Sequence, residues 1–298
     1  MTNVTKCVIC DGPFTKRKRA LVAPFLALRI WRKQTFCVDL VQCRECGFIF
    51  YNPRLDETDL RNLYTGYRSE EYQQMRNRFE PWYSVKMNSD LASAESYKNR
   101  REILAEILKK HLNGRSIRKV LDHGGDHGDL VSGLIPGAAA YVYDISGVHP
   151  ATNVTATTDP TACQADLIIN SNVLEHVGFP RALVREILAA LPEGGLVYLE
   201  VPCELPFGPY RVARRIAQIG LTMLMRPSSA LPLLQLPALY LMHEHINYFT
   251  EESLVTLMKK GGGEVVASGS YLFAGAGGRA NIAWCLGSRP TFKMPNVS

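Results

Sequence analysis

The sequence contains no apolar run of the roughly 18 residues that a membrane-spanning helix requires. The apolar stretch ALVAPFLALRIW, at 20–31, is interrupted by Pro24 and Arg29. The N-terminal residues are polar and show no signal-peptide pattern. An internal repeat is absent as well. These absences argue against a membrane-spanning or secreted protein, and we expect a cytoplasmic one.

A large excess of one charge is also lacking. The 298 residues include 34 Lys and Arg against 28 Asp and Glu, which gives a net charge of +6. Such a balance tolerates an anionic substrate but does not demand nucleic acid. The one dense basic run, KRKR at 16–19, is typical of a solvated face. The length suits one large domain and a small one.

Four of the eight cysteines lie in two close pairs. The pairs are Cys7 with Cys10 and Cys43 with Cys46. Gly12 and Gly47 follow shortly, and glycine permits the tight turn that points backbone amides at thiolate sulfurs. Four thiolates around Zn²⁺ form a closed structural site, whereas catalytic zinc keeps a position for water. We expect a zinc-binding module at 1–55, with a hairpin or helix between the pairs.

Residues 56–115 carry apolar side chains at helical spacing and are expected to form connecting helices. Strand and helix signals then alternate within a domain at 116–298. Strands are expected at 117–124, 138–146, 165–174, 196–202, 264–272 and 280–287, and helices at 181–195 and 251–263. This alternation predicts an α/β fold with a doubly wound, mostly parallel sheet.

The stretch LDHGGDHGDL, at 121–130, follows the first of these strands and has two interpretations. His123 and His127 are spaced like metal ligands on a helix. Alternatively, Gly124 and Gly128 let the backbone approach a cofactor, and DLVSGLI begins a helix. The metal alternative is weaker, because the paired cysteines offer zinc a better site and two glycines lie between the histidines.

An acidic residue on the next strand supports the cofactor interpretation. Asp144 ends that strand, 22 residues after Asp122. A carboxylate there can accept hydrogen bonds from the ribose hydroxyls of NAD or S-adenosylmethionine. The spacing alone does not separate the two cofactors.

Five segments in order separate them: VLDHGGDHG, YVYDIS, ADLIINSNVLEHV, LPEGGLVYLEVP and HEHINYFTEESLVTLMKKGG. Together they resemble class I S-adenosylmethionine-dependent methyltransferases over residues 117–287. CRECGFIFYNPRLDETDLRNLYTGY resembles the zinc module that precedes this domain in sugar C-methyltransferases. The resemblance implies a seven-stranded, Rossmann-like sheet that binds S-adenosylmethionine. Asp126 departs from it, because that family usually has glycine there.

The resemblance also implies the site residues. Its cofactor contacts are Asp122, Gly124, Gly128, Asp144, Asn172 and Leu174. In sugar C-methyltransferases a Glu-His pair serves as the acid-base group, and Glu244 and His245 take that place here. His245 is the expected general base, because an unperturbed histidine has a pKa near 6.5. A structural loop anchored by buried histidines is the alternative. His176 either lines the site as a catalytic residue or caps the next helix.

Two departures from the sugar C-methyltransferases favour O-methylation. Met242 replaces a tyrosine of that family, and the sequence ends about 50 residues after HEHINYF, without that family's C-terminal domain. Residues 205–241 form an apolar insertion whose arginines could hold a phosphate. We expect a lid over the acceptor. An oligomer contact and peripheral contact with a lipid-linked substrate remain open.

The leading prediction is a methyltransferase acting on a sugar, nucleotide sugar or glycan end in carbohydrate or natural-product biosynthesis. A first alternative is an RNA or DNA methyltransferase that uses the zinc module and the run at 16–19 as a clamp. Against it, the turn at 170–173 lacks the prolines of many base-methylating enzymes. Further alternatives are a non-catalytic binding module with this fold and an NAD-dependent oxidoreductase.

Overall fold

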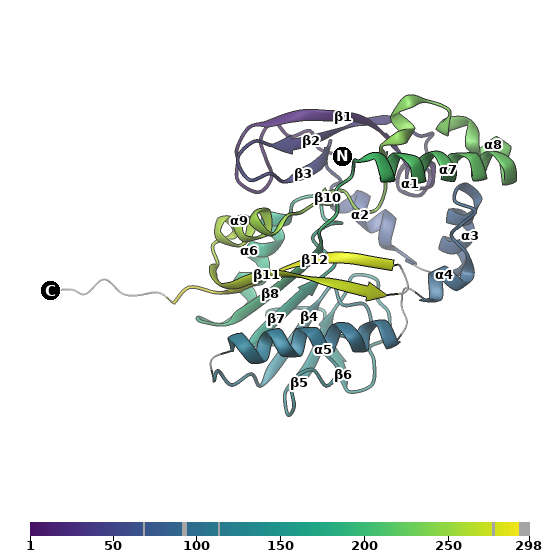
Figure 1. Cartoon of the computed structure of the whole chain (residues 1–298). Helices are drawn as coiled ribbons and strands as arrows, with labels where there is room; N and C mark the ends of the chain where they lie inside the picture. The colour runs from purple at the N-terminus through teal and green to yellow at the C-terminus, as the bar shows by residue number, and fades with distance from the viewer. Residues whose placement is uncertain (68, 91–93, 113, 276–277, 292–298) are drawn as a thin grey trace.

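The computed structural model describes residues 1–67, 69–90, 94–112, 114–275 and 278–291, which build two sheets (Figure 1). The larger sheet has seven strands in the order β11-β12-β8-β7-β4-β5-β6. Its strands are β4 (Lys119–His123), β5 (Ala139–Tyr143), β6 (Val154–Ala156), β7 (Leu167–Ser171), β8 (Leu196–Pro202), β11 (Glu264–Gly275) and β12 (Gly278–Ser288). The strands from β4 to β8 pair in parallel, whereas β12 is antiparallel to both of its neighbours. The predicted mostly parallel seven-stranded sheet is confirmed.

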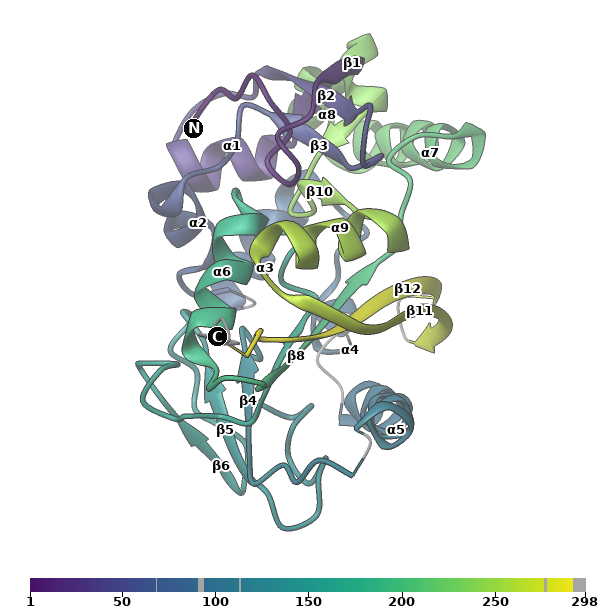
Figure 2. The ribbon, with the colours of Figure 1, turned by 90° about the vertical axis from the view of Figure 1, so that its left-hand side faces the viewer.

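Both faces of this sheet are buried, as the apolar strands predict. Alternate residues of a strand point to opposite faces. Accordingly, Leu121 packs in a core with the helices α6 (Pro180–Ala190) and α9 (Glu251–Gly261). Its neighbour Val120 packs in another core with α5 (Ala94–His111). Figure 2 shows α6 and α9 together on one side and α5 on the other.

The segment after β4 differs from the sequence prediction. DLVSGLI was expected to begin a helix, and this expectation was wrong, because residues 126–133 form successive turns. The backbone φ angle is positive at Asp126 (56°), Gly128 (76°) and Gly133 (69°). A right-handed helix requires negative φ at every residue, so it cannot propagate through this segment.

The smaller sheet has five strands in the order β10-β3-β2-β1-β9. Three come from the N-terminal segment: β1 (Phe14–Val22), β2 (Cys37–Cys43) and β3 (Ile49–Asn52). The segment between the cysteine pairs thus contains strand and also helix, since α1 (Pro24–Trp31) follows β1. Two short strands from much later in the chain, β9 (Leu241–Met242) and β10 (Asn247–Tyr248), complete the two edges. The loop at 243–246 therefore connects one edge of this sheet to the other.

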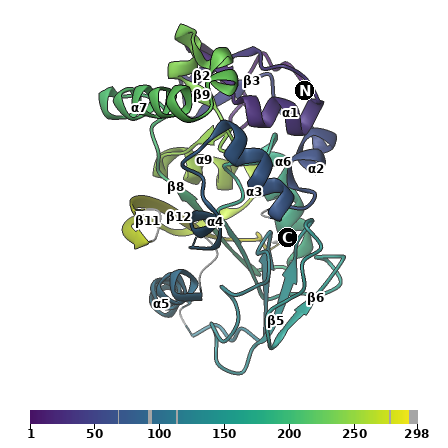
Figure 3. The same ribbon diagram turned by 90° about the vertical axis from the view of Figure 1, so that its right-hand side faces the viewer.

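Helices and an insertion surround the smaller sheet. The helices α2 (Glu57–Tyr64), α3 (Glu70–Phe79) and α4 (Val85–Asp90) follow β3. The insertion contains α7 (Pro209–Met225), α8 (Pro227–Ala230) and the 3₁₀ turns η1 (Leu231–Leu233) and η2 (Leu236–Leu239). In Figure 3 the insertion lies at the end of the molecule opposite β5 and β6. Among the described residues, no helix is long and apolar enough to cross a bilayer.

Candidate active site and metal centre

The glycine loop after β4 folds tightly over Asp122. A Cβ atom on Gly125 would lie 2.0 Å from the Asp122 carboxyl carbon, and one on Gly124 would lie 2.6 Å from a Val173 methyl group. Gly124 and Gly128 also have φ of 78° and 76°, where glycine is favoured. The loop therefore requires glycine for its close approach, and it lies at the carboxyl ends of the parallel strands.

Asp144 fixes the other side of this loop. Its carboxylate accepts hydrogen bonds from the backbone N–H of Asp126 at 2.9 Å and of Ser146 at 2.7 Å. Asp126, which stands where many methyltransferases have glycine, thus contributes its amide to the loop with a left-handed backbone. The structure brings Asp122, Asp144 and the two glycines together at the ends of β4 and β5.

Buried polar atoms without a partner gather beside the loop. Neither carboxylate oxygen of Asp122 nor the Asn170 Oδ1 has a hydrogen-bond partner among the described residues. Burial raises the pKa of Asp122 to about 7, and Asp144 and Glu200 add to that rise while Arg100 opposes it. Unpaired buried polar groups are costly, so they indicate a ligand. A cation suits them, and S-adenosylmethionine is cationic at both its sulfur and its amino group.

Asn170 was missed by the sequence analysis, although a polar residue within the apolar strand ADLIIN is a signal. It is fully buried and its Nδ2 donates to the His123 carbonyl at 2.9 Å. Two of the predicted cofactor contacts come shortly after Asn170 in the chain. Asn172 has a backbone φ of 56°, and its backbone N–H donates to the Glu200 carbonyl. The Leu174 side chain lies in the core, so only its backbone could face a ligand.

The two histidines of the loop face different partners. Burial lowers the pKa of His123 to about 4, and its ring packs 5.0 Å from that of Tyr143. His127 Nδ1 lies 2.6 Å from the His149 carbonyl. Neither histidine belongs to a group of side chains that could hold a metal ion among the described residues. The cofactor interpretation of LDHGGDHGDL is the one that the geometry favours.

Arg100 on α5 forms an ion pair with Glu200 near the ends of β7 and β8. Arg100 donates to Glu200 at 2.7 Å and also to the hydroxyl of Ser171. Glu200 accepts further hydrogen bonds from Ser171, Tyr198 and Tyr271 at 2.7–2.8 Å. Burial alone would raise the pKa of Glu200, but Arg100 and the hydrogen bonds from Ser171 and Tyr198 lower it. Arg100 was not predicted, because nothing in the pattern of its helix separates it from surface arginines.

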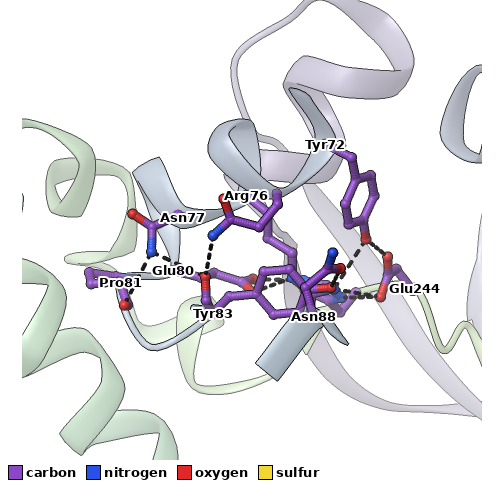
Figure 4. Close-up of polar contacts among 10 residues, drawn as sticks. Tyr72, Arg76, Asn77, Glu80, Pro81, Tyr83, Asn88 and Glu244 are labelled. Atoms are coloured by element: carbon purple, nitrogen blue, oxygen red, sulfur yellow. Dashed lines mark hydrogen bonds and ion pairs between the residues drawn. The ribbon is translucent and has the colours of Figure 1, made fainter. Parts of the chain in front are cut away.

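Glu244 lies in a buried charge network (Figure 4). Arg76 binds it at 3.0 Å, the Tyr72 hydroxyl donates to it, and His243 Nδ1 lies 3.6 Å away. Glu80 pairs with both Arg76 at 2.8 Å and His243 at 2.6 Å. Although burial alone would raise the pKa of Glu244, Arg76 and His243 hold it well below its usual range. Its carboxylate stays charged, and it anchors the loop at 243–246.

His245, the next residue, faces His176 instead. The two rings lie 4.8 Å apart at 79°, and the His245 side chain is 36% exposed. His245 Nδ1 is 3.7 Å from Glu204, and Arg211 holds Glu204 at 2.9 Å. Burial would lower the pKa of His245, but Glu204 and the nearby Glu175 raise it. A partly open histidine thus lies beside carboxylates that stabilise its protonated form.

His176 does not cap the next helix. The N-cap of α6 is Phe179, and no side chain caps that helix. His176 Nδ1 instead lies 3.0 Å from the Glu244 carbonyl oxygen. Of the three predicted catalytic residues, the structure brings His176 and His245 together, and it turns the Glu244 carboxylate toward Arg76.

Comparison with known families identifies the domain that carries these residues. A family model described as a methyltransferase domain matches residues 67–268. The chain belongs to this methyltransferase family. Among solved structures, it resembles a candidate methyltransferase of Bacillus halodurans and an S-adenosylmethionine-dependent methyltransferase of Methanosarcina mazei. The first has 10% identity and a TM-score of 0.42, over 63% of this chain and 99% of that one. The second has 16% identity and a TM-score of 0.43, over 62% of this chain and 98% of that one. No match is found among curated proteins.

The methyltransferase also carries a cluster of four cysteines. Cys7, Cys10, Cys43 and Cys46 place their sulfur atoms within 4.8 Å of one another. Three of the sulfur–sulfur distances are 3.4–3.7 Å. Tetrahedral Zn²⁺ with Zn–S bonds of about 2.3 Å would hold its sulfurs about 3.8 Å apart. The distances fit such a site.

Backbone amides complete the cysteine cluster. Ile9 N–H points at the Cys7 sulfur at 3.5 Å, and Glu45 N–H points at the Cys43 sulfur at 3.4 Å. Both amides lie two residues after a cysteine, in the tight turns that the glycines of each pair predict. Such amides stabilise thiolates, so the cluster suits a metal cation.

A buried arginine connects the smaller sheet to the rest of the methyltransferase. Arg54 is fully buried and donates to the carbonyls of Tyr51 and Gly178 at 2.8 Å and of Val177 at 3.1 Å. It also donates to the Asn247 side chain. Burial lowers the pKa of Arg54 to about 9, so it remains charged at neutral pH. Arg54 was not predicted, and the only signal was its place in the segment FYNPRLDETD.

Proposed function

We propose that this methyltransferase moves a methyl group from S-adenosylmethionine to a hydroxyl of a sugar, nucleotide sugar or glycan end, with His245 as general base. The observation that carries the proposal is the setting of His245. Its ring is partly open, faces His176 and has Glu204 beside it. Histidine with a pKa near neutrality suits proton removal from a hydroxyl.

In this proposal, the cofactor and the residues of the chain have separate roles in methyl transfer. When bound, S-adenosylmethionine supplies a methyl group on a positively charged sulfur. His245 would take the proton of the acceptor hydroxyl, and Glu204 would stabilise the resulting imidazolium. Arg211 holds Glu204 in place, and the Glu244 backbone orients His176. Positioning of this kind supplies much of the rate enhancement of group transfer.

Two further choices rest on the sequence and the packing. Met242 is fully buried where sugar C-methyltransferases have a tyrosine, which favours oxygen over carbon as the methylated atom. We also infer that the four cysteines hold a structural Zn²⁺, because a closed thiolate set leaves no position for water.

The test is transfer of a labelled methyl group to a panel of nucleotide sugars, glycans, RNA and DNA. We expect transfer to a carbohydrate hydroxyl, and loss of about 10²- to 10⁴-fold in kcat for His245→Ala. His111→Ala is the matched control, because His111 packs on Trp284, away from the loop at 243–246. Unchanged turnover in His245→Ala would remove His245 as base. Transfer to nucleic acid alone would overturn the carbohydrate acceptor.

A further inference from the structure

The insertion exposes many large apolar side chains and buries two polar ones of its long helix. In α7, Arg215 and Thr222 are turned inward, where Arg215 donates to the Ala238 carbonyl at 2.9 Å. Leu224 on the same helix is 83% exposed, and Leu236 in η2 is 82% exposed. Further exposed apolar side chains of the insertion are Tyr210, Ile216, Leu231 and Leu234. Exposed apolar side chains that gather on one segment, here the insertion, indicate a docking surface.

A strongly basic strand lies beside this apolar surface. β1 pairs with β9, which ends the insertion, and its residues 16–19 are Lys-Arg-Lys-Arg, all exposed. Arg17 lies over the Phe207 ring at 5.8 Å, and Lys18 lies over the Tyr240 ring at 5.3 Å. A cavity of about 330 Å³ lies among these four side chains. Figure 1 shows β1 and α7 at the same end of the molecule.

The two neighbouring segments contain no acidic residue, and the acidic residues at their ends each pair with one basic residue: Asp39 with Lys16 at 2.6 Å and Glu204 with Arg211 at 2.9 Å. Residues 12–38 include seven Lys and Arg and no Asp or Glu, and residues 205–243 include four Arg and no Asp or Glu. The rest of the chain therefore holds all 28 acidic residues and only 23 of the 34 basic ones. Arg17 and Lys18, which lie against Phe207 and Tyr240, thus place positive charge beside the exposed apolar side chains of the insertion.

We propose that this surface, formed by β1 and residues 205–240, docks on an anionic lipid membrane. An interfacial helix places its apolar side chains among the acyl chains, while Lys and Arg bind the anionic headgroups. The cavity between Arg17 and Lys18 would take a lipid phosphate. A second copy of this chain fits less well, because a two-fold interface formed by this surface would gather the basic side chains of both copies without an acidic surface opposite them.

Docking would bring the active site to the membrane surface. The insertion begins directly after Glu204, and Arg211 of α7 is the residue that holds Glu204 beside His245. An acceptor carried on a lipid phosphate would then lie near the catalytic loop. The docking itself does not depend on the acceptor, because it is a property of this surface alone.

The experiment is co-sedimentation of the full chain with vesicles of phosphatidylglycerol or of phosphatidylcholine. We expect binding to the first that weakens with added salt, and much weaker binding to the second. Leu224→Asp with Leu236→Asp should reduce binding by about tenfold or more. These positions are over four-fifths exposed, so the variants should fold, and far-UV circular dichroism checks this. Leu272→Asp is the matched control, because Leu272 is exposed on β11.

A second pair of variants tests the charges. Arg17→Gln with Lys18→Gln should reduce binding to phosphatidylglycerol by about fivefold for each charge removed. Lys109→Gln with Lys110→Gln, at the end of α5, removes the same charge elsewhere and should leave binding unchanged. Two results would overturn the proposal. One is equal binding by all variants, or by none. The other is a dimer, seen by analytical ultracentrifugation, that Leu224→Asp abolishes while vesicles never bind the wild type. Either leaves the methyl-transfer assay unaffected.

Discussion

Replacing Arg54 by methionine should cost roughly 3–5 kcal/mol of the free energy of unfolding. Arg54 donates to three backbone carbonyls at 2.8–3.1 Å, those of Tyr51, Val177 and Gly178, and to the side chain of Asn247. The Val177 carbonyl would keep a hydrogen bond from the Asn247 amide at 2.7 Å, and each other buried acceptor left without a partner costs about 1–3 kcal/mol. The total cost is smaller than the sum of these losses, because burial of methionine does not require a charged group to leave water. Methionine also fills much of the same volume, so the loss reports the hydrogen bonds.

Urea unfolding followed by far-UV circular dichroism and tryptophan fluorescence measures this cost. The matched control is Arg185→Met, on the exposed side of α6, which should change the free energy of unfolding by less than about 0.5 kcal/mol. Arg54→Lys should fall between the two, because a single ammonium group cannot reach all the acceptors in one plane. A cost below about 1 kcal/mol for Arg54→Met would refute the reasoning.

Three further predictions concern the metal and the catalytic loop. Cys46→Ser should lower both the zinc content, measured by elemental analysis, and the melting temperature. Cys163→Ser, the control, should keep the metal, and equal zinc in both variants would contradict a zinc site at the four cysteines. His245 cannot accept a proton while protonated, so kcat/KM should rise as the pH rises through its raised pKa. Glu204 is the main cause of the raised pKa of His245, so Glu204→Gln should move the rising limb of the pH profile of kcat/KM to lower pH. A limb that does not move would exclude Glu204 as the partner of His245. Glu244→Gln should lower kcat by about tenfold or more through loss of loop position. The limb set by His245 should move to lower pH by less than in Glu204→Gln, because Glu244 raises the pKa of His245 less than Glu204 does. Activity equal to wild type would show that Glu244 does not position the loop.

The larger sheet was predictable because its signals are local. Strands β7 and β8 begin as runs of apolar residues, since both faces of a parallel sheet are buried, and each ends at polar residues or a proline. The glycines of the cofactor loop were predictable for the same reason, because φ near +77° at Gly124 and Gly128 is a local requirement. The helix expected after that loop was wrong because Gly133 and Asp126 also adopt positive φ, and a helical pattern of apolar residues does not reveal this.

The partners of the catalytic loop were not predictable from local patterns. Strands of two residues, such as β9 and β10, carry no periodic signal, and their pairing joins segments about 200 residues apart. Arg76 and Glu244 are likewise 168 residues apart, so their ion pair exists only once the fold is known. The resemblance singled out Glu244 as a site residue but could not show that Arg76 and Tyr72 already bind its carboxylate.

The loop at 243–246 connects the four-cysteine cluster to the proposed site of methyl transfer. Cys46 is followed closely by Phe48, whose ring packs 4.8 Å from that of Phe249, just after the loop. β3 follows Phe48 and pairs with β10, which fixes the residue after Ile246. A zinc ion that holds the cysteine turns would therefore also hold one end of the loop that carries His245. Arg54 reinforces the same end through Asn247. On the proposed mechanism, the two edge strands of the N-terminal sheet would set the position of the general base His245.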